Sequence, residues 1–248
     1  MNSSHALDMP PPLTSILSEG PAALFLDFDG TLVELAPGPD QIAPRCDLPV
    51  QLARLDKWLE GRSAIVSGRA LADIEAHIGP LPIAGAGSHG SDLRAANGLT
   101  LGDAPEGLPR DIEQALRAFA AQNALDYEHK PHGGALHYRS NPEMGPRAHA
   151  FADELAALHG WSAQSGKCVV ELVSSKANKG AAVYSFMRAA PFAGSRPFFI
   201  GDDLTDEAGF RACAELGGAG ILVGTREDTY ARYRLSDVAS VHDWLGFG

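Results

Sequence analysis

The sequence lacks the features of a secreted or membrane-bound protein. Its three cysteines lie far apart, form no Cys-x-x-Cys pair and leave one over if a disulfide is assumed, a pattern typical of a reducing compartment. Residues 1–20 have neither the basic start nor the apolar core of a signal peptide, and no later run is long enough to span a membrane. We therefore expect a cytoplasmic protein with no membrane partner.

Positive charge is also scarce. The chain has 20 Lys and Arg residues against 31 Asp and Glu residues, which gives a formal net charge of -11. A nucleic-acid backbone or an anionic membrane surface would be repelled over most approaches, so we expect neither as a partner. A phosphate ligand must therefore meet local positive charge. The 248 residues can bury a sizeable core, in one large domain or two small ones.

Strand and helix patterns alternate at both ends of the chain. In the first part, apolar strand patterns at 22–26 and 63–66 alternate with helical spacing at 48–59 and 71–78. In the last part, helices are predicted at 178–190 and 205–216, the second with Thr205 as its N-cap, and strands at 197–202 and 219–224. This alternation predicts a parallel sheet with helices on its faces.

The middle of the chain follows a different pattern. Helices are predicted at 108–121 and 146–159, and each is followed by two short strands, at 126–130 and 135–139 and then at 162–164 and 168–173. Helix-strand-strand, repeated, predicts an α+β insert. We therefore expect an α/β core built from residues 1–100 and 175–248, with 1–20 as an N-terminal arm, and an inserted α+β domain at 101–174.

Two carboxylates directly follow the first apolar strand. Asp27 and Asp29 are one residue apart, and positions i and i+2 of an extended chain face the same side. Ligands of open α/β sheets bind beyond the carboxyl ends of the strands, so both acids would meet a ligand there. Because Asp and Gly are also ordinary turn residues, Asp-x-Asp-Gly alone leaves a simple turn open.

A second acidic cluster follows the strand predicted at 197–202. Asp206 and Glu207 fit the first turn of a helix, whereas Asp202 and Asp203 stand where the strand ends. Two strands that release carboxylates at one sheet edge crowd negative charge, which favours a bound cation. Oxygen ligands beside a phosphate indicate Mg²⁺.

Two further positions offer groups that bind phosphate. Ser67 ends a core strand and Gly68 follows it, so the hydroxyl and nearby amides are suited to a phosphate, although such turns are common. Lys179 stands at the start of a helix, where its charge opposes the helix dipole; a solvated surface lysine is the ordinary alternative.

These stretches, in order, resemble the four motifs of the haloacid dehalogenase-like (HAD) phosphatase superfamily: Asp27-Phe28-Asp29-Gly30-Thr31, Ser67, Lys179 and Gly201-Asp202-Asp203. The insert resembles the cap of one subclass. The resemblance implies a Rossmann-like core, with Asp27 as nucleophile and Asp29 as acid and base. It also implies Mg²⁺ held by Asp27, the Asp29 carbonyl and Asp202, and phosphate held by Ser67, Gly68 and Lys179.

The last motif continues as Leu204-Thr205-Asp206-Glu207, which is similar to the trehalose-6-phosphate phosphatase family. Three stretches of the insert point the same way: Glu128-His129-Lys130, His137-Tyr138-Arg139 and Gly166-Lys167 leading to Glu171. The resemblance implies that trehalose hydroxyls are held by Glu128, Lys130, Arg139, Glu171 and His89. One departure is Ala177, where the family often has glycine. We expect a monomer whose partner is a small sugar phosphate.

Other functions remain open at this stage. Gly85-Ala86-Gly87-Ser88-His89-Gly90 matches a dinucleotide-binding motif, but no amphipathic helix pattern follows it. His129, His132 and His137 suggest zinc without a complete ligand set. A signalling receiver that holds a phosphate would be shorter than this chain. A sugar-phosphate sensor without catalytic activity would not need all the acidic residues of the motifs. The nearest alternatives are a sucrose-phosphate phosphatase, a mannosyl-3-phosphoglycerate phosphatase and a phosphomannomutase-like phosphotransferase.

Overall fold

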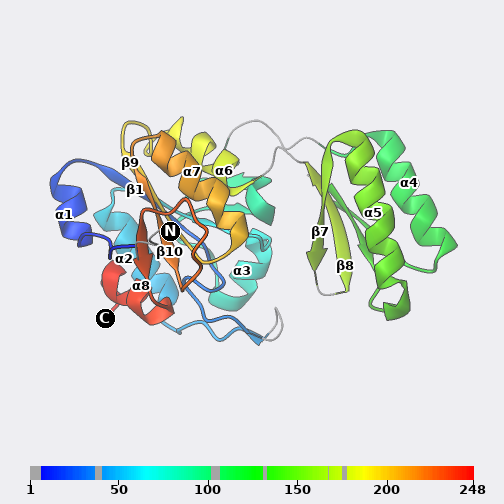
Figure 1. Ribbon diagram of the computed structural model, residues 1–248, viewed down its shortest axis with the longest axis horizontal. Helices are drawn as coiled ribbons and strands as arrows, with labels where there is room; N and C mark the ends of the chain where they lie inside the picture. Colours follow the sequence, from blue (N-terminus) through cyan, green and yellow to red (C-terminus); the bar gives the residue numbers. More distant parts are fainter. Residues whose placement is uncertain (1–6, 37–40, 102–106, 131–132, 167, 175–177) are drawn as a thin grey trace, which may run out of the picture. The chain divides into compact units, whose positions relative to one another are not determined.

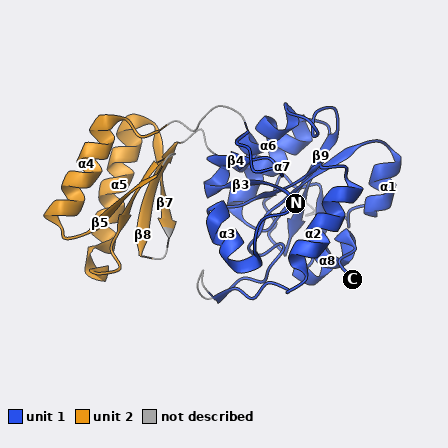
Figure 2. Cartoon of the chain, turned by 180° about the vertical axis from the view of Figure 1, so that it is seen from behind, with its two compact units in different colours: residues 1–102, 178–248 blue, residues 103–177 orange. Residues whose placement is uncertain are grey.

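The computed structural model divides the chain into two compact units (Figure 2). The core unit comprises Met1–Gly102 and Asn178–Gly248, and the insert unit comprises Asp103–Ala177. The structure describes residues 7–36, 41–101, 107–130, 133–166, 168–174 and 178–248. Within these ranges, no helix is both long enough and apolar enough to cross a bilayer.

A seven-stranded sheet forms the centre of the core unit (Figure 1). Its strands, in spatial order, are β11 (Tyr233–Leu235), β10 (Ala219–Val223), β9 (Arg196–Gly201), β1 (Ala22–Leu26), β2 (Ser63–Val66), β3 (Ala84–Gly87) and β4 (Asp92–Arg94). All neighbours pair in parallel except β4, which is antiparallel to β3. The strand β1 therefore lies beside β9, so the first and last parts of the chain share one sheet.

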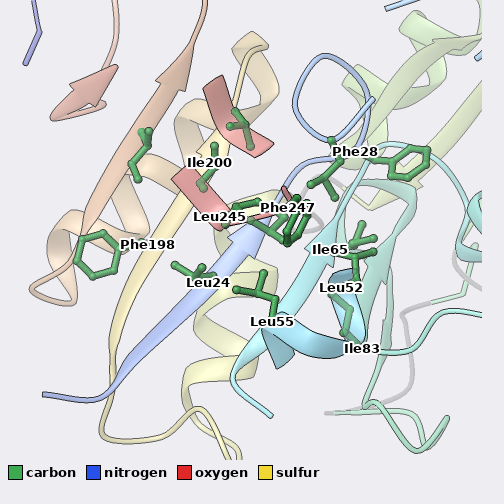
Figure 3. Close-up of a cluster of buried hydrophobic side chains, with 14 of the residues drawn as sticks. Leu24, Phe28, Leu52, Leu55, Ile65, Ile83, Phe198, Ile200, Leu245 and Phe247 are labelled. Atoms are coloured by element: carbon green, nitrogen blue, oxygen red, sulfur yellow. The ribbon is translucent and has the colours of Figure 1, made fainter. Parts of the chain in front are cut away.

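Helices cover both faces of this sheet. Along β1, Leu24 and Leu26 pack into one apolar cluster and Ala23 and Phe25 into another, as strand alternation requires. The first cluster includes residues of α1 (Leu13–Ser18), α2 (Leu48–Trp58), α3 (Leu71–Ile78) and α8 (Val238–Leu245). Figure 3 labels its members Leu52 and Leu55 of α2 and Leu245 of α8. The second includes residues of α6 (Lys179–Met187) and α7 (Glu207–Glu215). Burial on both faces explains why every residue of β1 is apolar.

The insert unit is a four-stranded antiparallel sheet with helices against one face (Figure 2). Its elements follow the order α4 (Arg110–Gln122), β5 (Asp126–Lys130), β6 (Gly133–His137), α5 (Gly145–His159), β7 (Trp161–Gly166) and β8 (Val169–Ser174). Residues of α4 and α5 pack on Leu136, Val170 and Leu172. The opposite face, here called the open face, carries Glu128, Lys130, Ala135, Gln164 and Glu171, which pair or alternate in register.

The predicted fold class is confirmed, including the parallel α/β core and the repeated helix-strand-strand order of the insert. Two local predictions are wrong. Thr205 is not an N-cap, because Asp203 caps a short 3-10 helix, η4 (Leu204–Asp206), through a reciprocal capping box with Asp206. The strand predicted at 135–139 begins two residues earlier, because Gly133 and Gly134 belong to β6 and both pair with β5 and β8.

Candidate active site

Asp27 and Asp29 lie at the carboxyl edge of the core sheet, directly after β1. The Asp27 amide donates to the Ile200 carbonyl at 2.9 Å, which extends the pairing with β9 beyond the end of the strand. Gly30 then turns the chain at φ +74°, and a Cβ atom there would overlap the carboxylate of Asp202. Glycine is therefore required both by the backbone angle and by the close approach of Asp202.

Lys179 reaches this edge from the first turn of α6, whose N-terminus is capped by the Asn178 side chain. Its ammonium donates to Asp27 Oδ1 at 2.8 Å and to Asp206 Oδ1 at 2.6 Å, and its side chain is only 3% exposed. Burial favours the neutral amine, but the two carboxylates outweigh burial and raise the pKa of Lys179. Lys179 is therefore a buried cation of the site rather than a solvated surface lysine.

Three carboxylates come together beside this ammonium. Ligand oxygens of Asp27, Asp202 and Asp206 all lie within 4.8 Å of one another. Burial, followed by the charges of Asp27 and Asp203, raises the pKa of Asp202 to about 7. Burial and Asp27 likewise raise the pKa of Asp206 to about 8, although Lys179 opposes this. One ammonium among three carboxylates leaves two negative charges when all are ionised.

The donor set fits a hard divalent cation. The Oδ1 atom of Asp202 is buried and makes no hydrogen bond within the described part of the chain. A buried carboxylate oxygen without a partner is costly, whereas a coordinated cation would satisfy it. The excess of two negative charges matches the same ion, and all-carboxylate oxygen ligands favour Mg²⁺ over softer metals.

Ser67, Gly68 and His89 meet at the end of the neighbouring strand β2. The Ser67 hydroxyl is buried and accepts a hydrogen bond from the Arg69 amide at 3.1 Å, while the Ser67 carbonyl accepts one from the His89 amide at 2.9 Å. A Cβ atom at Gly68 would lie 2.7 Å from His89 Cε1. The imidazole thus packs directly on Gly68.

The glycine motif around His89 does not bind a dinucleotide in the way that its spacing suggests. Gly85 and Gly87 lie within β3, and Gly90 ends a three-residue 3-10 helix, η2 (Ser88–Gly90), that leads into β4. A Rossmann fingerprint needs these glycines to open a long helix. That interpretation is therefore wrong, because a strand follows the motif.

Sequence reasoning missed two charged residues of this edge. Asp206 was interpreted only as a residue of a first helical turn, yet it is fully buried against Lys179. Its place among four acids within the six positions from Asp202 to Glu207 was the available signal. Arg69, two residues after Ser67, forms a bidentate pair with Asp29, with Nε–Oδ2 2.6 Å and a second N–Oδ1 distance of 2.8 Å.

Four of the five predicted sugar-binding residues lie in the insert unit, all except His89, and three of these four share its open face. Lys130 Nζ is 2.8 Å from Glu171 Oε2, and Glu128 Oε2 is 2.8 Å from His137 Nε2. Lys130 is on β5 and Glu171 on β8, so their pair crosses the intervening strand β6. Arg139 differs, because it lies in an exposed turn after β6.

Among the described residues, His129 and His137 do not share a zinc site. His137 belongs to the open face, whereas His129 belongs to the opposite face and lies 3.3 Å from Glu113 of α4. Two residues on opposite faces of a sheet cannot share one ion. His132 lies outside the described residues, as do Lys167 and Ala177.

Comparison with known proteins shows which family the chain resembles. A family model for trehalose-phosphatase matches residues 25–239. The chain is 37% identical over 241 residues to the trehalose-6-phosphate phosphatase of Escherichia coli (strain K12), and the alignment covers 94% of this chain and 90% of that relative. It is 38% identical over 205 residues to a probable trehalose-phosphate phosphatase of Sinorhizobium fredii, with 82% and 77% covered.

Solved structures show the same fold at lower identity. The C-terminal domain of the trehalose-6-phosphate phosphatase of C. albicans superposes with a TM-score of 0.69 at 22% identity, covering 99% of this chain and 98% of that one. A haloacid dehalogenase-like hydrolase from Bacteroides thetaiotaomicron gives 0.67 at 14% identity, covering 91% and 98%. The curated relatives indicate a phosphatase. With a family model that spans most of its length, this chain belongs to the trehalose-phosphatase family.

Proposed function

We propose that the protein hydrolyses trehalose 6-phosphate to trehalose and phosphate, with Mg²⁺, through an aspartyl-phosphate on Asp27. The observation that carries this proposal is the buried carboxylate of Asp27, held by Lys179 beside Asp202 at the sheet edge. Family membership supports the reaction class, and the names of the curated relatives support the substrate.

A sugar alkoxide is a poor leaving group, so its departure needs a nucleophile, charge neutralisation and a proton donor. Asp27 attacks phosphorus, and Lys179 fixes the orientation of its carboxylate through Oδ1. Asp29 gives a proton to the departing sugar oxygen and later takes one from the water that cleaves the aspartyl-phosphate. The hydroxyl of Ser67, the amides around Gly68 and the ammonium of Lys179 bind phosphate oxygens.

The residues that would hold the metal are Asp27, the backbone carbonyl of Asp29 and Asp202, and Asp206 belongs to the same carboxylate group. When bound, Mg²⁺ supplies positive charge that stabilises the phosphoryl oxygens in the transition state. Asp206 also accepts a hydrogen bond from the Lys179 ammonium, so it helps to keep the ammonium at the phosphate site.

Substrate choice is assigned to the insert unit, acting as a cap domain, and to His89 of the core. Glu128, Lys130 and Glu171 offer charged hydrogen-bonding groups on a face that no described helix of this unit covers, and Arg139 adds a guanidinium nearby in sequence. Sugar hydroxyls both donate and accept hydrogen bonds, so a mixture of carboxylates and cations suits them.

Phosphate release from a panel of sugar phosphates tests this function. With Mg²⁺ present, trehalose 6-phosphate should be turned over faster than the phosphates of sucrose, glucose, mannose and mannosylglycerate, and chelation by EDTA should stop turnover. Preference for another sugar would replace the substrate but keep the reaction class. Transfer of phosphate to a second sugar position without release would instead identify a phosphotransferase.

The protein is proposed to act as a monomer. All residues assigned to the reaction come from a single chain, with the chemical groups in the core unit and the sugar-binding groups in the insert unit. Light scattering after size exclusion should give the mass of one 26.1 kDa chain at assay concentrations. A dimer mass that persists on dilution would contradict this.

A further inference from the structure

Arg69 joins three parts of the site that the sequence motifs treat separately. Its guanidinium binds both oxygens of Asp29 and also donates to Asp73 Oδ2 at 2.7 Å, in the first turn of α3. Its backbone amide donates to the Ser67 hydroxyl. Arg69 thus links Asp29, which follows β1, with Ser67 at the end of β2 and with Asp73 of α3.

The geometry of this pair is unusually restrictive. A bidentate arginine–carboxylate pair fixes the plane and direction of the carboxylate as well as its distance. The Arg69 side chain is 11% exposed, so the pair is shielded from water more than an ordinary surface pair. Burial opposes the charge of the guanidinium, but Asp29 and Asp73 outweigh it and raise the pKa of Arg69. The cation is therefore permanent.

We propose that Arg69 is a positioning residue for proton transfer: its guanidinium, bound to both carboxylate oxygens, orients the Asp29 side chain that exchanges protons in the two halves of the reaction. This inference rests on the proposed function, in which Asp29 exchanges protons with the sugar oxygen and with water. In the first half, the Asp29 proton moves to the sugar oxygen as the P–O bond breaks. In the second half, the resulting carboxylate takes a proton from the water whose oxygen attacks phosphorus; the P–O bond to Asp27 breaks, and phosphate and the free Asp27 carboxylate are released.

Leaving-group dependence separates this role from a structural one. A sugar alkoxide needs the proton from Asp29, whereas p-nitrophenolate leaves without much help, and kcat/KM reports the steps up to leaving-group departure. Replacing Arg69 with Gln should lower kcat/KM for trehalose 6-phosphate by about 10- to 100-fold, within the range of general acid catalysis. The value for p-nitrophenyl phosphate should fall by less than about 5-fold, because protonation of this leaving group contributes little.

A double-mutant cycle shows whether the effect passes through Asp29. In an Asp29→Asn background, Arg69→Gln should cause no further loss of kcat/KM for the sugar phosphate beyond about 2-fold, since residues that act as a unit are not additive. Arg69→Lys should lose activity as well, because an ammonium cannot hold both oxygens. If the Gln variant does not fold, the two kcat/KM values are compared for the Lys variant instead. The Lys variant keeps a cation beside the carboxylates of Asp29 and Asp73.

The chain contains a matched control. Arg45 forms a second bidentate pair, with Asp47, at 3.0 and 2.9 Å on the exposed surface. Arg45→Gln should leave the ratio of the two kcat/KM values unchanged. Equal losses on both substrates for the Arg69 variants, or additive losses with Asp29→Asn, would overturn the positioning role. If Asp29→Asn itself showed no leaving-group dependence, the proposed function of Asp29 would fail instead.

Discussion

The two units hold their charged residues in opposite ways. At the sheet edge of the core, Lys179, Asp27 and Asp206 have side chains 3%, 5% and 0% exposed. On the open face of the insert, Lys130 and Glu171 are 22% and 18% exposed, and His137 and Glu128 are 39% and 51% exposed. Buried charges depend on each other's presence, whereas exposed pairs are screened by water. This difference agrees with the proposed roles, in which the core residues keep a fixed geometry for the reaction and the insert residues exchange their partners for a ligand.

This comparison predicts that the largest effect follows removal of the nucleophile. Asp27→Asn should lower phosphate release by more than about 10³-fold, as for nucleophiles of other enzymes. The fold should survive, because Asn keeps the size of the side chain and Lys179 retains Asp206. Phosphate release and thermal unfolding should be measured together, with mass spectrometry to exclude deamidation. Full turnover by the intact Asp27→Asn variant would contradict the assignment.

Removing the charge of Lys179 should lower both activity and stability, whereas removing an exposed charge should have little effect on stability. Lys179→Met leaves two buried carboxylates without their cation, so we expect loss of phosphatase activity and a fall in unfolding free energy of about 3 kcal/mol. Denaturant unfolding measures the second effect. The matched control is Lys57→Met on the exposed side of α2, which should change the free energy by less than about 0.5 kcal/mol. Equal changes in unfolding free energy for the two variants would contradict the distinction between buried and exposed charges.

The raised pKa values predict how pH acts on the metal-free core. In the folded protein Asp202 and Asp206 have pKa values of about 7 and about 8, above the ordinary value of 3.8. Between pH 3.8 and about pH 8, the folded protein holds protons on these two side chains that the unfolded chain has already lost. The stability of the folded state therefore decreases as pH rises toward 8. The metal-free melting temperature should therefore carry a downward slope with pH over this window, and Asp202→Asn should flatten it.

Metal binding should oppose that slope. Because carboxylates bind a cation in their ionised form, the rise in melting temperature on adding Mg²⁺ should be larger at pH 8 than at pH 6. NaCl at equal ionic strength serves as the comparison for general salt effects. A rise in melting temperature that did not depend on pH, or that NaCl reproduced, would exclude these acids as the metal site.

The smallest effect is expected in the insert. Glu171→Gln keeps the shape of the side chain but removes the charge that pairs with Lys130. Loss of one charged hydrogen bond to a sugar should raise KM for trehalose 6-phosphate by about 10-fold. Hydrolysis of p-nitrophenyl phosphate should not change, because it lacks the sugar. Glu113→Gln, on the helix-covered side of the insert, is the control; a loss on both substrates for Glu171→Gln would contradict a role limited to the sugar.

Sequence patterns predicted the position of the strand-end acids at the sheet edge, because a buried parallel strand is recognisable as a continuous apolar run. Asp27 and Asp202 each stand directly after an apolar run, and parallel strands bring such residues to one edge. Asp206 was missed because an ordinary local role explained it. Arg69 was missed because its neighbours in the sequence do not indicate its pairing with Asp29. Asp206 fits a helix start, and its side chain in fact serves both as a cap and as the partner of Lys179.

The register of the insert was beyond prediction from the sequence. Lys130 and Glu171 are 41 residues apart, and only the order β5-β6-β8-β7 brings them together across β6. The intervening strand carries the small residues Gly133 and Ala135 on the same face, between the strands that hold the two charges. Strand alternation predicts which residues share a face of one strand, but not which strands become neighbours.

Trapping the phosphorylated protein tests the central claim most directly. In the Asp29→Asn variant, p-nitrophenyl phosphate should still phosphorylate Asp27, whereas hydrolysis of the intermediate should stall for lack of a base. A rapid-quench experiment should then show a burst of one nitrophenolate per protein molecule, with a phosphoryl group mapped to Asp27 by mass spectrometry. Phosphate release without any burst, or a phosphoryl group on another residue, would contradict the account.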